Sequence, residues 1–152
     1  MEKHTFDIVI DAPRETVWDI LWNQATYPEW TAVFSPGSRA VTTWQQGSKV
    51  LFVDGSNAGM VATVVENQPP AFMSFKHLGM VKDGVEDLDS DLVRPWAGAL
   101  ENYSLSTENG KTRLTVEMDI TPEHKDYFVN AWPLALAQVK QLAESARAGK
   151  VS

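Results

Sequence analysis

Two residues that could do acid–base chemistry, His77 and Glu101, fall on neighbouring predicted strands. Phe75 sets the inward phase of the first strand and Tyr103 that of the second, because side chains alternate along a strand. If Phe75 lies opposite Tyr103, His77 lies opposite Glu101, since paired residue numbers in an antiparallel ladder have a constant sum. A buried carboxylate is costly unless it is paired, so this pair could orient the polar end of a ligand or act as a general base. The alternatives are a satisfied structural pair, or a pair in contact with water at a cavity mouth.

Other chemistry has little support in the sequence. The three histidines, His4, His77 and His124, are far apart and show no paired metal spacing, and there is no cysteine. No nucleophile elbow, phosphate loop or dinucleotide fingerprint occurs. The acidic stretch within residues 79–95 lacks the ligand spacing of an EF-hand. We therefore predict no metal, no cofactor and no covalent nucleophile.

Composition limits the partners. The 152 residues, with 43% hydrophobic and 22% charged residues, predict one globular domain over residues 1–152. A net charge of −7 argues against nucleic acid. No apolar run is long enough to insert into a membrane, and the N-terminus does not resemble a signal peptide, so a cytoplasmic location is expected.

Two helices must frame the site. Pro13 favours a helix over about residues 13–22, followed by a short helical or irregular stretch that ends at Trp30. Thr121 and Pro122 favour the start of a terminal helix that runs to about Ala148 with one buried stripe. Pro133 should kink or break this helix, because it lacks an N–H and clashes with the preceding turn.

Seven short strands are predicted between and before these helices. They cover residues 5–11, 39–44, 48–53, 60–66, 71–78, 97–107 and 112–120. Asp54-Gly55 and Asn109-Gly110 are typical of tight hairpins, and Pro69-Pro70 should separate two strands. Residues 79–95 form the single long link, which we interpret as a lid or a flexible loop.

The order of these elements, together with several short motifs, resembles the SRPBCC superfamily of START and Bet v 1-like proteins. Within it, the chain is most similar to bacterial proteins related to the C-terminal domain of the Hsp90 ATPase activator. The motifs are Ile10-Asp11-Ala12-Pro13, Val17-Trp18, Tyr27-Pro28-Glu29-Trp30, Pro69-Pro70, Asn109 to Thr115 and Ala131-Trp132-Pro133-Leu134-Ala135-Leu136.

The resemblance implies an α+β helix-grip fold. In that fold a curved antiparallel sheet of six or seven strands wraps a long C-terminal helix, short helices follow the first strand, and a cavity lies between sheet and helix. The resemblance implies binding of a hydrophobic, lipid-like or aromatic small molecule. Two alternatives stay open: a polyketide cyclase-like enzyme that uses Glu101 and His77, and a chaperone partner of the Hsp90 type. Fold alone does not decide between them.

Aromatic residues complete the predicted site. Trp18 and Trp132 lie on buried helix stripes, whereas Trp30, Trp44 and Trp96 each lie at the end of a segment, where a cavity entrance is expected. Small residues, Ala97 and Ala99, should leave space beside Glu101. The predicted ligand-binding residues are Trp30, Trp44, Met73, Phe75, His77, Trp96, Ala99, Glu101, Tyr103, Phe128 and Trp132.

Overall fold

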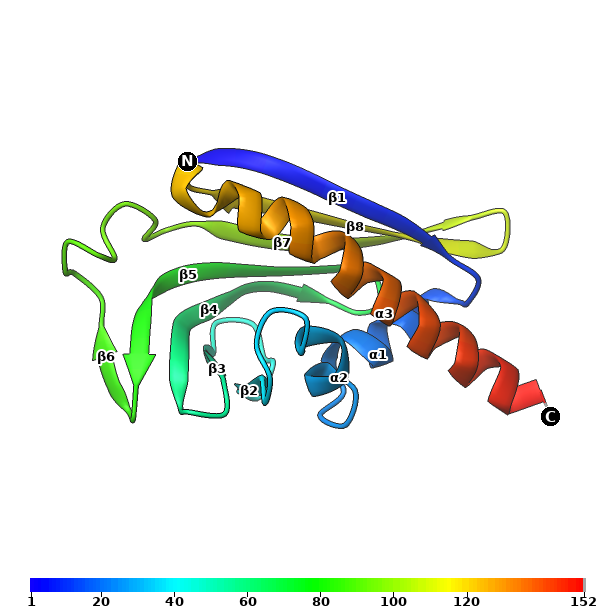
Figure 1. Ribbon diagram of the computed structural model, residues 1–152. Coiled ribbons are helices and arrows are strands. Elements are labelled where there is room, and N and C mark those ends of the chain that lie inside the picture. Colours follow the sequence, from blue (N-terminus) through cyan, green and yellow to red (C-terminus); the bar gives the residue numbers. More distant parts are fainter. Residues whose placement is uncertain (152) are drawn as a thin grey trace.

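One antiparallel sheet and a long C-terminal helix make up most of the molecule (Figure 1). The computed structural model describes the backbone of residues 1–151 and the side chains of residues 1–146. The strands are β1 (Glu2–Ile10), β2 (Arg39–Val41), β3 (Lys49–Val53), β4 (Ala58–Gln68), β5 (Phe72–Lys82), β6 (Val85–Asp87), β7 (Leu100–Glu108) and β8 (Lys111–Ile120). The helices are α1 (Arg14–Trp22), α2 (Tyr27–Thr31), the short 3-10 helix η1 (Pro122–His124) and α3 (Lys125–Val151). The predicted α+β helix-grip fold is confirmed, with an eighth strand beyond the six or seven expected.

The sheet order is β1-β8-β7-β5-β4-β3-β2, and β6 pairs with β5 off this path. β1 forms one edge of the sheet and pairs along its whole length with β8, from Glu2 opposite Ile120 to Ile10 opposite Thr112. The helix α3 crosses one face of the sheet, and α1 and α2 lie on the same side (Figure 1). Every pair of hydrogen-bonded strands is antiparallel, so tight turns suffice where the paired strands are also consecutive in the chain, as for β3 and β4 or β7 and β8.

The turn chemistry explains two of these connections. Asn109 and Gly110 alone join β7 to β8, with φ of 52° and 80°. Positive φ at both central residues is the conformation that an Asn-Gly hairpin favours, so this prediction is confirmed. The link between β3 and β4 is longer than the predicted tight hairpin, since β3 ends at Val53 and β4 begins at Ala58. The Asp54 carboxylate stabilises this link by accepting hydrogen bonds from the backbone N–H groups of Ser56 (2.8 Å) and Ala58 (3.2 Å).

Irregular pairing bends the sheet around the helix. The ladder between β4 and β5 shifts register between Val61 and Ala62 and again between Val64 and Glu66. Such bulges bend a strand and increase its local twist. Gly59 lets β4 lie very close to β3, because a Cβ at this position would be 1.7 Å from the carbonyl oxygen of Phe52. The concave face that results is the one that α3 crosses.

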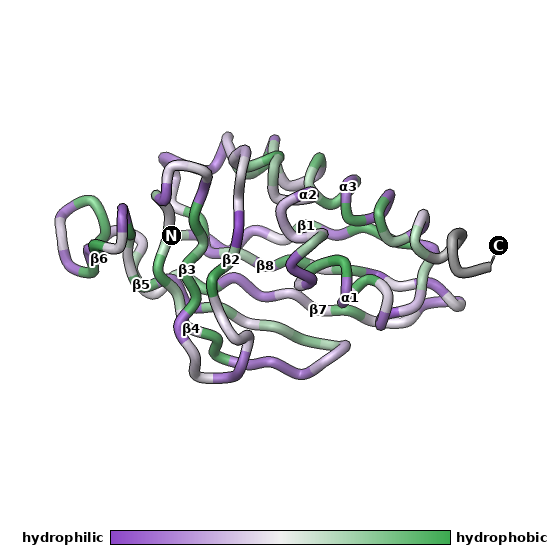
Figure 2. Tube along the Cα trace, turned by 90° about the horizontal axis from the view of Figure 1, so that it is seen from below, coloured by the Kyte–Doolittle hydropathy of each residue, from purple (hydrophilic) through white to green (hydrophobic). Residues whose placement is uncertain are grey.

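The interpretation of residues 79–95 as one long link is wrong in its first half. β5 continues to Lys82, turns at Asp83 and Gly84 with positive φ at both, and returns as β6. This hairpin lies at one end of the molecule, far from α1 and α2, in both Figure 1 and Figure 2. The remaining connection, residues 88–99, contains a run of turns around the fully buried Val93.

The terminal helix differs from the expectation at Pro133. η1 begins at Pro122 as predicted, but α3 continues through Pro133 to Val151. Of the predicted kink or break at Pro133, the break is therefore wrong, and the predicted end near Ala148 is slightly early. Buried residues on both sides of Pro133, including Trp132 and Leu136, hold the two halves against the same sheet. Packing of this kind stabilises a helix that has lost one backbone hydrogen bond.

The second half of α3 lies in a solid core. It packs against α1 and β1, and Val17, Leu21, Val139 and Ala143 have no exposed surface there. Small residues on α3 let the two helices approach closely, and Figure 2 shows hydrophobic and hydrophilic residues alternating along α3, as expected for a helix with one buried face. Among the helices within residues 1–151, none is long and apolar enough to span a membrane.

Candidate functional site: a cavity beside α2

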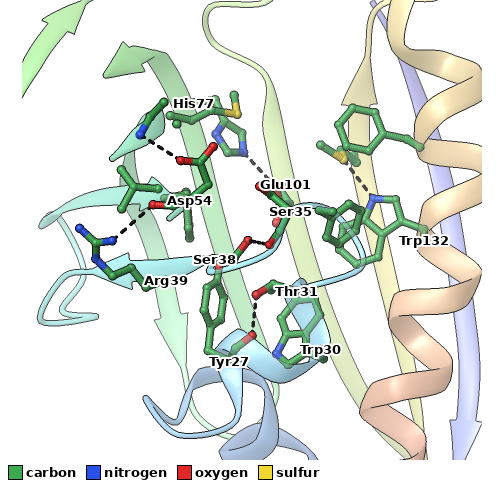
Figure 3. A pocket seen from close by; sticks show the side chains of 18 of the residues that line it. Tyr27, Trp30, Thr31, Ser35, Ser38, Arg39, Asp54, His77, Glu101 and Trp132 are labelled. Carbon is green, nitrogen blue, oxygen red and sulfur yellow. Dashed lines mark hydrogen bonds and ion pairs between the residues drawn. The ribbon is translucent and has the colours of Figure 1, made fainter. Parts of the chain in front are cut away.

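A cavity of about 300 Å³ lies between the sheet, α2 and the first half of α3, and opens to solvent (Figure 3). Most of its lining is aromatic or aliphatic. The lining comprises Tyr27, Trp30, Thr31, Phe34, Ser35, Ser38, Arg39, Phe52, Val53, Asp54, Ala58, Gly59, Met60, His77, Glu101, Tyr103, Met118, Tyr127, Phe128 and Trp132. The volume suits a small organic molecule, at the lower end of the range of known ligand pockets.

Three polar side chains meet inside this cavity, and we call them the Glu101 network (His77, Glu101 and Tyr103). His77 Nε2 lies 2.9 Å from Glu101 Oε1, and the Tyr103 hydroxyl donates a hydrogen bond to Glu101 Oε2. The side chains of His77 and Glu101 are only 4% and 13% exposed, and Tyr103 is buried. The predicted meeting of imidazole and carboxylate therefore occurs.

The register that led to this prediction is wrong by two residues. Phe75 lies opposite Glu101, and Met73 lies opposite Tyr103. The backbone N–H of His77 donates to the carbonyl of Ala99 at 2.8 Å, in line with the same offset. His77 reaches Glu101 diagonally rather than directly across the ladder, as long side chains on one face of a sheet can do.

The hydrogen bonds assign the tautomer of His77. Its Nδ1 atom is buried and has no hydrogen-bond partner among the described residues. A proton on Nδ1 would leave a buried donor unsatisfied, which costs more than a bare ring nitrogen. We therefore assign a ring proton to Nε2, which donates to Glu101, so that the carboxylate receives two hydrogen bonds.

The pKa values of two tyrosines are raised at this site. Burial is the main cause that raises the pKa of Tyr27 and of Tyr103 well above the usual value of 10.0, and the negative charge of Glu101 raises both further. The hydrogen bond from Tyr103 to Glu101 also raises the pKa of Tyr103. Both phenols thus stay neutral at physiological pH and can donate hydrogen bonds in the cavity.

Tryptophans build the cavity walls and are themselves fixed by hydrogen bonds. Trp30 Nε1 donates to the carbonyl of Leu21 at 3.2 Å, which ties α2 to the end of α1. Trp132 Nε1 donates to the sulfur of Met118 at 3.4 Å, and its ring lies 6.2 Å from that of Trp30. These two rings form a wall beside the Glu101 network, because the ring of Tyr103 lies 6.5 Å from that of Trp30 and 6.0 Å from that of Trp132 (Figure 3).

Exposed and half-buried residues surround the opening, and we call them the cavity mouth (Ser38, Arg39, Asp54 and Tyr127). Arg39 donates to Asn57 Oδ1 at 2.6 Å and to the carbonyl of Asp54 at 3.4 Å. The Tyr127 hydroxyl donates to the carbonyl of Phe34 at 2.8 Å. The mouth is therefore polar, whereas the walls below it are aromatic.

The structure places the predicted ligand-binding residues in three groups. Six of them line the cavity: Trp30, His77, Glu101, Tyr103, Phe128 and Trp132. Met73 and Phe75 on β5, and Ala99 just before β7, are buried but do not line the cavity. Trp44 lies outside it and lines a neighbouring depression with Trp22, and Trp96 lies half-buried in the connection before β7. Ala97, expected inside, is exposed.

Sequence reasoning missed several lining residues. Tyr27 was noted only as part of the Tyr27-Pro28 motif, although it is the first residue of α2 and nearly buried. Phe52 lies on β3 and Phe34 in the connection after α2, and neither was predicted to face the cavity. Strand alternation alone could have found Phe52, because it has the same phase as the buried Val50. Phe34 has no periodic signal.

Within the described part of the chain, no cluster of three or more His, Cys, Asp or Glu residues could hold a metal ion.

Residues 11–144 match the family described as Activator of Hsp90 ATPase homolog 1-like protein, and the chain belongs to this family. Comparison with curated protein sequences finds no match. Many solved structures share the fold.

One of these structures is the Aha1 dimer from Colwellia psychrerythraea, with a TM-score of 0.73, 16% identity, and coverage of 95% of this chain and 97% of that one. CalU16 from Micromonospora echinospora has a TM-score of 0.63 and 18% identity, over 95% of this chain and 79% of that one. DynU16, from the dynemicin biosynthetic locus, has a TM-score of 0.72 and 13% identity, over 96% of this chain and 48% of that one. At these identities the likeness concerns the fold alone.

Proposed function

We propose that this protein binds a hydrophobic small molecule in the cavity beside α2, with a polar group of the ligand at the Glu101 network. The observation that carries the proposal is the combination of an open cavity of about 300 Å³ with a buried carboxylate–imidazole–phenol cluster inside it.

The energetics favour a bound organic molecule over a purely structural role. Trp30, Phe52 and Trp132 present apolar surface to the space, and each square ångström of apolar surface removed from water contributes about 25 cal/mol. Fixed aromatic walls also lower the entropic cost of binding, because they are already ordered. A structural ion pair would need no such space beside it.

Native mass spectrometry of the protein purified from its own host tests the proposal directly. We expect a bound mass that is lost on denaturation. A fluorescence titration with a small-molecule library would supply the affinity, since Trp30 and Trp132 line the cavity and should report occupancy.

Matched variants localise the binding. Ala58→Phe places a ring inside the cavity and should abolish binding, whereas Ala137→Phe adds the same ring on the exposed face of α3 and should leave binding unchanged. Equal binding by both variants, or no bound molecule in any assay, would contradict the proposal.

A second candidate is an enzyme, favoured by the hydrogen bonds that join His77, Glu101 and Tyr103. Such a cluster could transfer a proton to or from a bound polyketide-like substrate. The distinguishing result is turnover that Glu101→Gln abolishes while ligand affinity persists. Saturable stimulation of an Hsp90 ATPase would instead support a chaperone role of the kind that the family description names.

A further inference from the structure

We infer that the ligand of this cavity is an organic cation, in particular a protonated amine on an aromatic or short aliphatic body, and that its positive charge lies at Glu101. This inference rests on the proposed function and specifies the chemical class of ligand.

The charge balance at the Glu101 network is the first argument. Among the described residues, Glu101 is hydrogen-bonded to His77 and Tyr103, and no lysine or arginine forms an ion pair with it. The only lining cation in the described part of the chain is Arg39, which is exposed and already bound to Asn57 and to the carbonyl of Asp54 at the mouth. A partly buried carboxylate without a cationic partner favours a ligand that supplies one.

The hydrogen-bonding capacity of the network is the second argument. Each oxygen of Glu101 accepts one hydrogen bond, while a carboxylate offers about four lone-pair sites. The hydroxyl oxygen of Tyr103 can accept another. The unused capacity therefore consists mainly of acceptors, and an ammonium group provides three donors together with the missing charge.

The cavity walls supply the third argument. The rings of Tyr27 and Phe52 are nearly parallel, with an interplanar angle of 25° and centroids 6.4 Å apart. Trp30, Tyr103 and Trp132 also line the space. Aromatic faces attract cations, by about 0.5–2 kcal/mol each depending on desolvation. The same walls give no such advantage to a neutral or anionic group.

An anionic ligand fits the site poorly in either orientation. With its carboxylate inward it would meet the charge of Glu101. With its carboxylate at Arg39, its apolar tail would strip water from Glu101 and return no hydrogen bond, which is costly for a charged group. A cation placed inward avoids both costs.

A charge series on a constant carbon skeleton tests the inference. The probes are 4-phenylbutylamine, 4-phenylbutan-1-ol and 4-phenylbutyrate, followed by the same three head groups on phenylethyl and hexyl skeletons. Calorimetric titration at pH 7 should show the amine binding about tenfold more tightly than the alcohol on any skeleton that binds, and the carboxylate most weakly.

Two variants test whether the charge of Glu101 causes the preference for the amine. Glu101→Gln should remove the preference for the amine while retaining affinity for the alcohol, which also shows that the cavity is still folded. Glu117→Gln removes the same charge from a side chain on β8 that does not line the cavity, and should keep the preference.

Each outcome decides the inference. An alcohol or carboxylate that binds as tightly as the amine, or a preference that survives Glu101→Gln, overturns it while leaving the proposed function intact. A co-purified neutral or anionic molecule does the same. If no probe binds and no molecule co-purifies, the proposed function fails, and this inference fails with it.

Discussion

The two halves of α3 contact the same sheet but enclose very different interiors. The second half, with Ala135, Val139 and Ala143, lies against α1 with no exposed surface at these positions. The first half presents Phe128 and Trp132 to an open cavity. Small side chains allow close backbone approach, whereas large rings hold the helix away from a sheet that is already bent by bulges. One helix thereby anchors the fold at one end and forms the wall of a candidate binding site at the other.

The largest expected difference between these two interiors is in the stability lost when a side chain is truncated. Leu114→Ala, in the fully buried part of β8, should lower the free energy of unfolding by about 3 kcal/mol, because it leaves a closed void. Phe128→Ala should cost about 1 kcal/mol, because this half-buried ring already borders open space. Urea unfolding followed by circular dichroism measures both. Equal losses would show that the cavity end is packed as tightly as the other.

Adding volume should also destabilise the packed end more than the cavity end. Ala143→Leu forces extra methyl groups between α3 and α1 and should destabilise the protein by about 2 kcal/mol. Ala58→Leu adds the same atoms at the cavity lining and should change stability by less than about 0.5 kcal/mol. The pair is measured by the same urea titration. A large loss for Ala58→Leu would mean that the cavity cannot accept added atoms.

Alkaline pH should selectively weaken the cavity end. Tyr27 and Tyr103 have pKa values raised by burial and by Glu101, so the folded state keeps both protonated while the unfolded state ionises near pH 10. Their contribution is complete below pH 10, and it should fall above that value by up to about 1.4 kcal/mol per pH unit for each tyrosine. Unfolding titrations between pH 9 and 11 measure the slope, and Tyr27→Phe should reduce it. Phenolate absorbance that rises near pH 10 without unfolding would contradict this assignment.

The smallest effect concerns the anchored end. Glu144 accepts a hydrogen bond from the ammonium group of Lys140 and one from the backbone N–H of Asp11 at 2.9 Å, and both lower its pKa. Its contribution is therefore present above the usual carboxyl pKa and is lost as pH falls. Glu144→Gln should lower the stability by about 0.5 kcal/mol at pH 7, seen as a slightly lower melting temperature, and by less as the pH falls below the usual carboxyl pKa. Glu117→Gln, on β8 and away from the helix ends, is the matched control.

Local sequence signals predicted most of the framework. Pro13, Thr121-Pro122 and Asn109-Gly110 mark helix starts and a hairpin through their own backbone preferences, and these elements form where expected. Asp83-Gly84 carried the same kind of signal as Asn109-Gly110, but it lay within a stretch interpreted as a single link. The hairpin of β5 and β6 was missed for that reason.

Long-range geometry was harder to predict. The ladder between β5 and β7 was misplaced by two residues, because the intervening connection of residues 88–99 has no turn type that sets a register. The inward phase was nonetheless right, since a shift of two residues keeps every side chain on the same face. His77 and Glu101 therefore met as predicted, although Ala97 and Ala99 did not open space beside them.

The sequence by itself determined the order of the helices and of every strand except β6, the inward phase of β5 and β7, and the buried stripe of the terminal helix, because each depends on neighbouring residues. Tertiary structure alone decided where the interior stays open, and that Tyr27, Phe34 and Phe52 surround Glu101. Those positions depend on how bulges bend the sheet and how Trp30 and Trp132 hold the helices against it. Such contacts join segments far apart in the chain, and no local pattern encodes the distance between them.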